Sequence, residues 1–408
     1  MNIITNSIPV AEATPAALTT SKRLPAALWA LTISAFGIGT TEFVIVGLLP
    51  TMAQDLHISI PSAGLLVSLY AIGVAIGAPV LTALTSRVPR KQLLIMLMLL
   101  FTIGNGLASL APGFIPLVIA RIITGFAHGV FFSIGSTIAA ALVPVEKRAT
   151  AIAIMFAGLT VAIVTGVPFG TYIGQQFGWR ATFIGVALLG VVGLIASWIL
   201  VPGHLANQKA ASLKTQLKVI TNKRLVLAFL MTALGYGGTF VAFTYLSPLL
   251  QEITGLSASI VNIVLLLYGV AIAIGNIVGG KAANKQPLKA LLWMFILQAA
   301  VLLLFTYTVQ YTIPALITLF AMGALSFMNV PGLQLYVVQT AEKKLPGTAD
   351  VASAFNIASF NIGIAIGAYA GGLIVDSSLG LGATPWSGAI LVTLAIAITL
   401  WSARLARR

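Results

Sequence analysis

The sequence predicts an all-α membrane protein with twelve transmembrane helices in two six-helix pseudo-repeats. Three observations support this prediction. Of the 408 residues, 59% are hydrophobic and 7% are charged, whereas soluble domains carry about 25% charged residues. Twelve apolar runs are long enough to cross a bilayer, and a residue pattern of the first half returns in the second. Since so few charges cannot cover a water-facing surface, the apolar surface is expected to face lipid.

A helix needs about 20 mostly apolar residues to cross the hydrocarbon core of a bilayer. Charged, glycine-rich or proline-rich breaks separate the runs of this length. The expected spans are residues 26–50, 61–85, 92–110, 114–142, 149–172, 181–201, 225–250, 258–280, 289–309, 313–340, 350–374 and 385–404. Residues 1–24 lack the charged start, short apolar core and cleavage site of a secretory signal, so they are predicted to form a cytoplasmic tail.

Basic residues gather between alternate spans. If the N-terminus is cytoplasmic, 20 of the 22 lysines and arginines fall in cytoplasmic segments, and both termini lie inside. These residues are Lys22, Arg23, Arg87, Arg90, Lys91, Lys147, Arg148, Lys209, Lys214, Lys218, Lys223, Arg224, Lys281, Lys285, Lys289, Lys343, Lys344, Arg404, Arg407 and Arg408. The net charge of +14 is thus spread over loops that contact lipid headgroups. A nucleic-acid partner is not expected, because it requires basic residues gathered on one solvated face.

The second half restates the first at an offset of 198 residues. The matches include Leu69, Tyr70, Ala75, Ile76, Gly77, Val80 and Lys91 with Leu267, Tyr268, Ala273, Ile274, Gly275, Val278 and Lys289. The predicted division is a tail (1–24), a first half (25–201), a cytoplasmic linker (202–224) and a second half (225–408). Chance similarity is the alternative, since glycine, leucine and alanine recur in membrane helices. Parallel six-span halves suit a carrier whose central site opens to alternate sides, so the repeat favours transport.

Glu42 lies in the middle of the first span, and its repeat partner is Phe240. An ionisable group at that depth costs about 2.5–3.5 kcal/mol unless it faces a cavity, is paired or is protonated. Because burial favours the neutral acid, Glu42 is a candidate for reversible proton binding and proton coupling. The alternative is a permanently protonated side chain that bonds a neighbouring helix.

Arg121 and His128 lie in the fourth span, two helical turns apart on one face. The repeat partner of Arg121 is Leu319. A guanidinium keeps its proton, so Arg121 must find a carboxylate, carbonyl groups or water. Together the two residues could orient substrate or relay protons toward Glu42. Alternatively, Arg121 joins helices through carbonyls and His128 is a packing residue.

Neutral polar residues of the second half could line a substrate cavity, or each could simply bond one helix to another. They are Tyr236, Asn329, Gln334, Asn356 and Asn361. Their lack of charge favours a neutral or amphipathic substrate. The sequence has no Walker phosphate loop, no cysteine and three scattered histidines. We therefore expect no metal, no cofactor and no enzymatic activity, with a proton gradient as the energy source.

The fifth span contains small residues that permit close helix approach, and a proline that kinks a helix. These residues, Gly158, Gly166, Pro168 and Gly170, predict a packing seam. The loop between the second and third spans carries three basic residues, Arg87, Arg90 and Lys91.

At these residues the chain resembles the major facilitator superfamily, and within it the bacterial drug:proton antiporters near the arabinose and sugar efflux permeases. The resemblance covers residues 26–404. It rests on the segments 39–44, 47–50, 166–171 and 178–180, and on Arg121 with Gly125 and Gly129. The basic loop motif is kept, although Thr82 and Ser86 stand where the family usually has glycine and aspartate.

The resemblance implies the major facilitator fold, a bacterial inner-membrane location, an antiporter-type motif in the fifth span, and coupling by Glu42 with Arg121 assisting. The expected function is export of a sugar, nucleoside or amphipathic drug by proton antiport with alternating access. The expected partners are substrate, protons and membrane lipid, and one chain is expected to suffice as a monomer. An importer or facilitator of a neutral solute, or a non-transporting membrane receptor, remains the alternative.

Overall fold

The computed structural model describes residues 25–85, 87–144, 148–203, 213–283 and 286–407. Within these ranges it contains twelve helical segments long and apolar enough to span a membrane, and every regular element is helical. The twelve predicted spans are thus confirmed, with ends that differ by a few residues. The predicted tail, residues 204–212 of the linker, and Lys147, Lys285 and Arg408 lie outside the described residues.

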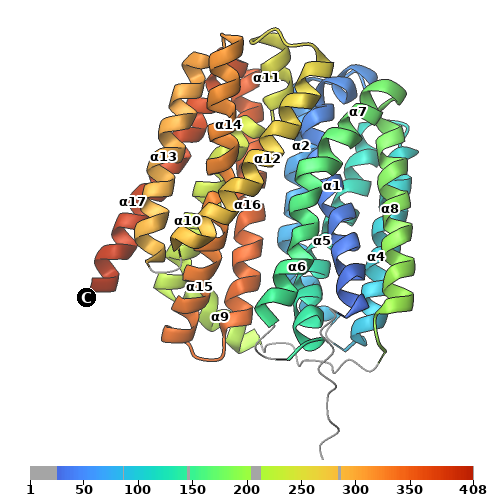
Figure 1. Ribbon diagram of the computed structural model, residues 1–408, viewed down its shortest axis with the longest axis vertical. Coiled ribbons are helices and arrows are strands. Elements are labelled where there is room, and N and C mark those ends of the chain that lie inside the picture. Colours follow the sequence, from blue (N-terminus) through green and yellow to red (C-terminus); the bar gives the residue numbers. More distant parts are fainter. Residues whose placement is uncertain (1–24, 86, 145–147, 204–212, 284–285, 408) are drawn as a thin grey trace, which may run out of the picture.

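The first six spans form one bundle (Figure 1). Their elements are α1 (Ala26–Asp55), α2 (Ile60–Ile76) with η1 (Gly77–Leu81) and α3 (Thr82–Leu84), α4 (Arg90–Ser109), α5 (Phe114–Ala141), α6 (Arg148–Val161) with η3 (Ala162–Gly166) and α7 (Val167–Phe177), and α8 (Trp179–Leu200). The short helix α9 (Leu213–Thr221) follows the undescribed part of the linker.

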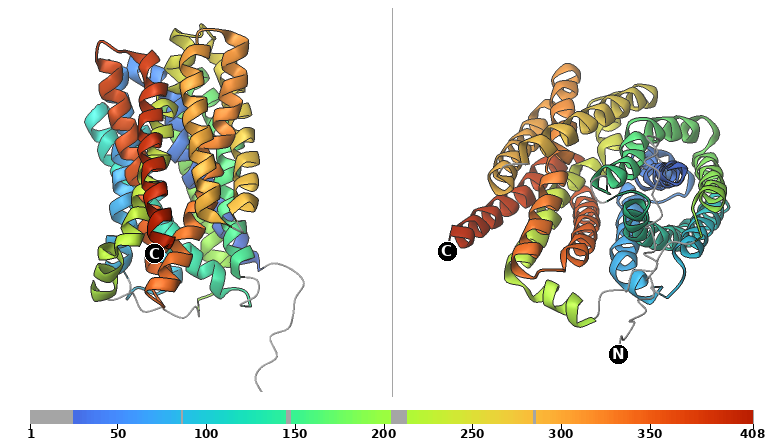
Figure 2. Two further views of the ribbon diagram at one scale, coloured as in Figure 1. Left: turned by 90° about the vertical axis from the view of Figure 1, so that its left-hand side faces the viewer. Right: turned by 60° about the horizontal axis from the view of Figure 1, so that its bottom comes forward.

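The last six spans form the second bundle, which lies beside the first in Figure 1 and in the right-hand view of Figure 2. Their elements are α10 (Lys223–Phe243) with α11 (Leu246–Glu252), α12 (Ala258–Ala283), α13 (Pro287–Thr308), α14 (Thr312–Met328) with α15 (Val330–Lys344), α16 (Ala349–Asp376), and η4 (Leu381–Ala383) with α17 (Thr384–Arg407). The two bundles and their parallel order confirm the predicted pseudo-repeats.

Prolines explain three interruptions that the apolar runs alone do not reveal. Pro79 lies inside the π-helical turn η1, and Pro168 follows the π-helical turn η3. Because proline has no N–H and its ring crowds the preceding turn, a wider turn accommodates it. The expected tenth span is two helices, since α14 ends at Met328 and α15 starts with Pro331 in its first turn.

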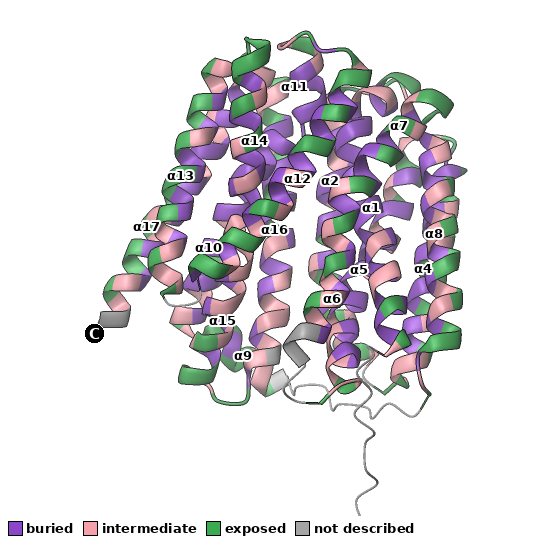
Figure 3. Cartoon of the chain, in the orientation of Figure 1, coloured by how far each residue is buried: buried purple, intermediate pink, exposed green. Residues whose placement is uncertain are grey.

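Burial separates core helices from lipid-facing ones (Figure 3). In the most apolar window of α1, 83% of residues are buried, against 28% in that of α8. Large side chains such as Trp198, Ile199 and Leu188 of α8 are exposed on the outer flank. An apolar side chain at such a position costs nothing in a bilayer, so α8 suits a lipid-facing position. Glu42 therefore lies on one of the most enclosed helices.

Contacts between the halves include hydrogen bonds at the end opposite the linker. The hydroxyl of Ser247 donates to the carbonyl of Gly47 at 3.4 Å, and Asn262 Nδ2 donates to Gln175 Oε1 at 2.7 Å. A Cβ atom on Gly64 of α2 would overlap the Tyr245 ring and hydroxyl of the other half. The halves are therefore closed against each other at this end.

The fifth span packs against α1 through its small residues. A Cβ atom on Gly158 would overlap the backbone carbonyl of Thr32, and one on Gly166 would overlap the Thr40 hydroxyl. A backbone atom cannot move aside as a flexible side chain can, so position 158 requires glycine.

We expect Gly158→Ala to destabilise the protein by about 1–3 kcal/mol, the usual cost of overpacking. The measurement is thermal unfolding in detergent. Gly185→Ala on α8 is the matched control, because a Cβ atom there meets nothing within 4 Å. An equal or smaller loss of stability in Gly158→Ala than in the control would contradict the packing argument.

Candidate functional site

Glu42, His128 and Arg121, the three ionisable residues expected inside the membrane, lie together in the core of the first half. Glu42 Oε2 is 4.0 Å from His128 Nδ1. Tyr70 Oη lies 3.0 Å from the same nitrogen, and the imidazole tautomer decides which of the two donates the hydrogen bond. Glu42 is 7% exposed and His128 5% exposed. The imidazole thus stands between the carboxylate and a phenol hydroxyl.

Arg121 packs against the ring of Tyr70. Its guanidinium carbon lies 3.9 Å from the centre of the Tyr70 ring, a cation–π geometry. Nη1 donates to the carbonyl of Thr41 at 2.9 Å, and Nε lies 3.5 Å from the carbonyl of Leu66. Arg121 and Glu42 also interact electrostatically. The Nη2 atom is buried and has no hydrogen-bond partner among the described residues, which is costly for a charged group.

Carbonyl bonding by Arg121 was one of the two alternatives open from the sequence, and the structure shows it. Arg121 joins α5 to α1 through Thr41 and reaches α2 through Leu66. The bonds fix the guanidinium beside Glu42, the residue after Thr41. Helix joining and a role at the acid are therefore compatible.

Sequence reasoning missed three members of this cluster: Tyr70, Thr41 and Asn105. The Thr41 hydroxyl donates to Asn105 Oδ1 at 2.7 Å, and Asn105 Nδ2 donates to the Phe101 carbonyl at 2.8 Å. Asn105 is a buried amide in an otherwise apolar span. A single amide in an apolar span could have marked Asn105 as a candidate site residue. Tyr70 did not stand out in this way, because the second half has a tyrosine, Tyr268, at the equivalent position.

The repeat shows how the two halves differ at this place. Tyr268 hydrogen-bonds with Ser326 at 2.8 Å, and these residues lie 198 positions after Tyr70 and His128. The second half thus keeps the tyrosine and the contact but replaces the imidazole with a hydroxyl. Phe240 and Leu319 stand for Glu42 and Arg121. Only the first half carries the ionisable form of the cluster.

The neutral polar residues of the second half mostly join helices. Asn329 Nδ2 donates to Gln298 Oε1 at 2.8 Å, and Gln298 Nε2 donates to the Gly235 carbonyl at 2.9 Å. Asn356 Nδ2 donates to Gln334 Oε1 at 2.7 Å. The structure therefore gives three of the five predicted cavity residues helix-to-helix bonds. Gln298 was missed, although it is an amide in an apolar span.

The other two residues behave differently. Asn361 Nδ2 donates to the Ile357 carbonyl of its own helix at 3.0 Å, while its Oδ1 has no partner among the described residues. The ring of Tyr236 packs against Phe240, Phe327 and Phe360, with centroids 5.0–5.3 Å apart. Tyr236 thus belongs to an aromatic group.

This aromatic group meets the first half beside Glu42. Phe43, the next residue along α1, lies 6.2–6.4 Å from the rings of Phe240, Phe243 and Phe327. We call Phe43, Tyr236, Phe240, Phe243 and Phe327 the aromatic seam. At the boundary between the halves, the Glu42 cluster therefore lies on the side of the first half, and the aromatic rings of the second half lie on the other side.

The predicted motif residues lie away from this cluster. Pro168 and Gly170 are buried in α7, and Gly170 faces Val44 of α1. Arg87 is exposed, and Arg90 and Lys91 begin α4 at the linker end of the bundle. The exposed carboxylate of Asp55 accepts from Trp179 Nε1 at 2.8 Å and Arg180 Nη1 at 2.6 Å, at the opposite end.

Comparison with known proteins identifies the family. Residues 31–350 match the model of the Major Facilitator Superfamily. The chain is 57% identical over 382 residues to the uncharacterized MFS-type transporter YtbD of Bacillus subtilis, covering 94% of this chain and 96% of the relative. It is 31% identical over 383 residues to a chloramphenicol resistance protein of Streptomyces lividans, covering 92% and 95%.

The fold agrees with that of a bacterial homologue of the human lysosomal transporter Spinster, solved in an inward-facing, occupied conformation. The TM-score is 0.73 at 16% identity, over 92% of this chain and 96% of the other. A likeness at this identity concerns the fold alone. The family match, these relatives and the twelve spans show that the chain belongs to the major facilitator superfamily and is a multi-pass membrane transporter.

Proposed function

We propose that the protein exports small molecules from the cytoplasm in exchange for protons, with Glu42 as the proton-binding group. One observation carries the proposal: the buried carboxylate and its ionisable neighbours exist in only one of two related halves. If these positions served only to hold the helices together, the residues of the second half, Phe240, Leu319 and Ser326, would be sufficient in the first half too. The extra cost of burying Glu42 indicates a function.

The geometry supports two protonation states of Glu42. Burial favours the neutral acid, whereas the fixed positive charge of Arg121 favours the carboxylate. His128 Nδ1, 4.0 Å from the carboxylate and 3.0 Å from the Tyr70 hydroxyl, is placed to accept or return a proton. In the proposed cycle, Glu42 takes up a proton when the site faces outward, which favours release of substrate. It loses that proton when the site faces the cytoplasm.

The aromatic seam supports an amphipathic substrate with an apolar ring. Rings at the seam offer apolar and edge-to-face contacts, while Glu42 and Arg121 lie beside them in the first half. One relative is a chloramphenicol resistance protein, and chloramphenicol belongs to this class of compound. Of the three classes considered, the seam favours an amphipathic drug over a sugar or nucleoside.

The proposal needs no resident cofactor, because the proton gradient supplies the energy. One proton moving down about 100 mV yields about 2.3 kcal/mol, enough for roughly 50-fold accumulation of a neutral solute exchanged one for one. We further propose an inner-membrane location with both termini in the cytoplasm and a functional monomer. The basic residues at the linker end support this orientation.

The test is proton release in proteoliposomes that carry a trapped pH indicator, with a panel of amphipathic drugs, sugars and nucleosides. We expect at least one compound to drive proton movement opposite to its own flux. Flux without a proton signal would favour a facilitator, and co-directional movement would favour an importer. Saturable binding of a compound without flux would favour a receptor.

A further inference from the structure

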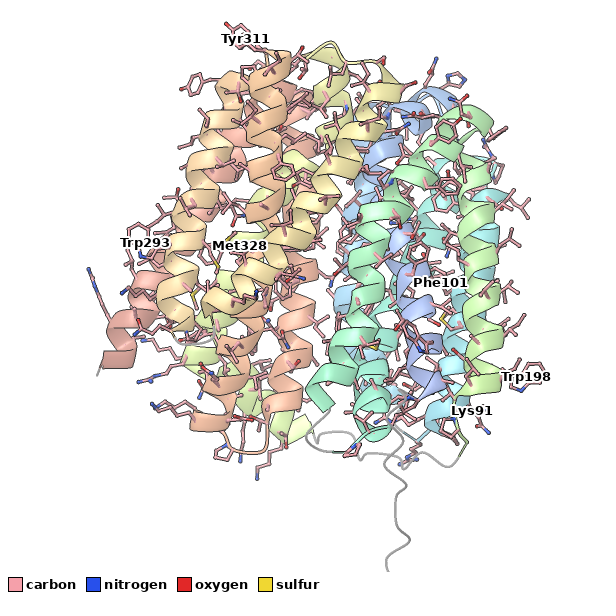
Figure 4. The ribbon with its side chains drawn as sticks, viewed as in Figure 1. Lys91, Phe101, Trp198, Trp293, Tyr311 and Met328 are labelled. Carbon is pink, nitrogen blue, oxygen red and sulfur yellow. The ribbon has the colours of Figure 1, made fainter. Side chains whose placement is uncertain are left out.

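A groove of about 470 Å³ lies on the outer flank of the second half, away from the Glu42 cluster. Its walls are the last turn of α12, the first turns of α13 and the end of α14. They include Ala282, Gln286, Lys289, Trp293, Leu297 and Met328. In Figure 4 Trp293 points outward from the bundle and Met328 lies nearer its interior. The volume falls within the ~300–1,000 Å³ of small-molecule sites.

The surface around the groove is apolar and exposed. Trp293 is 57% exposed and Leu297 50%, and Ile277 on the neighbouring helix α12 is 61% exposed. In a membrane transporter such a flank faces acyl chains, because nothing else in the described part of the chain covers it. The groove is therefore open to lipid.

Polarity changes along the groove. Gln286 and Lys289 lie at the start of α13, at the membrane surface, while Met294, Leu297 and Met328 continue it toward the bilayer centre. Among the described residues, neither salt bridge involves Lys289, so its ammonium is not neutralised by a carboxylate. Trp293 lies about one turn beyond Lys289 on α13 and level with Met328 (Figure 4), so its ring lines the apolar part of the groove. A basic end and an apolar channel match an amphiphile with an anionic head.

We propose that this groove binds an anionic phospholipid, with one acyl chain in the apolar channel and the phosphate at Lys289. The positive charge selects the headgroup, and the lipid-facing opening selects a membrane component over a water-soluble ligand. The assignment does not depend on the substrate, the direction of transport or proton coupling.

The lipid would contact the break between α14 and α15. Met328 ends α14 directly before Asn329, which bonds Gln298 of α13, and Gln298 bonds the Gly235 carbonyl of α10. An acyl chain against Met328 thus packs against the break between α14 and α15. Bound lipid is expected to stabilise this arrangement of the second half by mass action.

The internal repeat provides matched controls in the first half. Lys91 stands for Lys289 and is half-buried. Leu84 and Gln92 replace Ala282 and Ala290, so larger side chains occupy the equivalent positions. The basic residue is common to both halves, whereas the small residues that open the groove belong to the second half alone.

The experiment is native mass spectrometry of the delipidated full chain, titrated with phosphatidylglycerol or phosphatidylcholine. We expect preferential binding of phosphatidylglycerol, weakened about fivefold by Lys289→Gln, the effect of one lysine at a membrane surface. Lys91→Gln should leave it unchanged. Ala290→Phe should remove the tight site by filling the channel, with Gln92→Phe as its control. Equal effects of Lys289→Gln and Lys91→Gln would overturn the assignment.

A second measurement does not depend on the folding of the filled variant. Brominated phosphatidylglycerol, added at about one per protein, should quench the fluorescence of Trp293, so Trp293→Phe should lose most of the quenching. Trp198→Phe, a change at an exposed residue on the flank of the first half, should not. Quenching that is independent of Trp293 would contradict the proposal. Displacement of the lipid by a transported compound would assign the groove to substrate instead.

Discussion

Glu42→Gln is expected to abolish pH-driven transport while leaving the fold intact. Glutamine has nearly the shape of the neutral acid but cannot release a proton, so substrate binding can no longer be coupled to proton release. Because the neutral form is the one that burial favours, the amide should be tolerated at a site 7% exposed. The wild type should respond to a pH gradient, and the variant should show background flux at every gradient.

The measurement is gradient-driven uptake in proteoliposomes, with thermal unfolding measured on the same preparations. Glu252→Gln provides the matched control, since it is the same substitution at an exposed glutamate at the end of α11. Retained pH-driven transport in Glu42→Gln would dismiss Glu42 as the proton-binding group. Loss of transport in both variants would show that the assay does not report on the buried acid.

Arg121→Lys is expected to reduce transport at least tenfold although the positive charge is kept. Arginine binds the Thr41 carbonyl through Nη1, approaches the Leu66 carbonyl through Nε and stacks on Tyr70. Lysine has one compact ammonium and cannot make these contacts together. Loss of one charge-assisted hydrogen bond, worth about 1.5–3 kcal/mol, corresponds to a factor of about ten or more.

Initial rates at several external pH values separate a coupling role from a structural one. If Arg121 tunes Glu42, the pH dependence of transport should shift in Arg121→Lys, whereas a purely structural role would lower the rate equally at all pH values. Arg180→Lys is the control, because Arg180 pairs with an exposed carboxylate at the end of the bundle opposite the linker. Wild-type rates and pH dependence in Arg121→Lys would exclude Arg121 from the mechanism.

The two halves carry different residues at equivalent positions. The first half has a carboxylate, an imidazole and a guanidinium around Tyr70, and the second has a tyrosine and serine pair with aromatic neighbours. In a carrier whose halves rock against each other, this division would separate proton binding from substrate contact. The aromatic seam would then transmit the state of Glu42 through Phe43, the next residue on α1.

Some site residues were visible in the sequence and others were not, for a physical reason. Glu42, Arg121 and His128 stand out because an ionisable group is costly in an apolar span. A tyrosine such as Tyr70 is ordinary in such a span, so only its contact with His128 reveals it. The amides Asn329, Gln334 and Asn356 were candidates for a cavity. Instead Asn356 bonds Gln334, 22 residues away, and Asn329 bonds Gln298, 31 residues away, and the sequence does not show that these pairs meet.

Hydropathy and charge along the chain were enough to predict the twelve spans, the two related halves and the concentration of basic residues in alternate loops. These properties depend on hydropathy and length within one segment, and each segment satisfies its own backbone hydrogen bonds. Which faces of the helices meet depends on tertiary packing. The rotation of each helix depends on packing along its whole length, so the bond from Arg121 to Thr41, 80 residues away, follows from the assembled bundle rather than from either span alone.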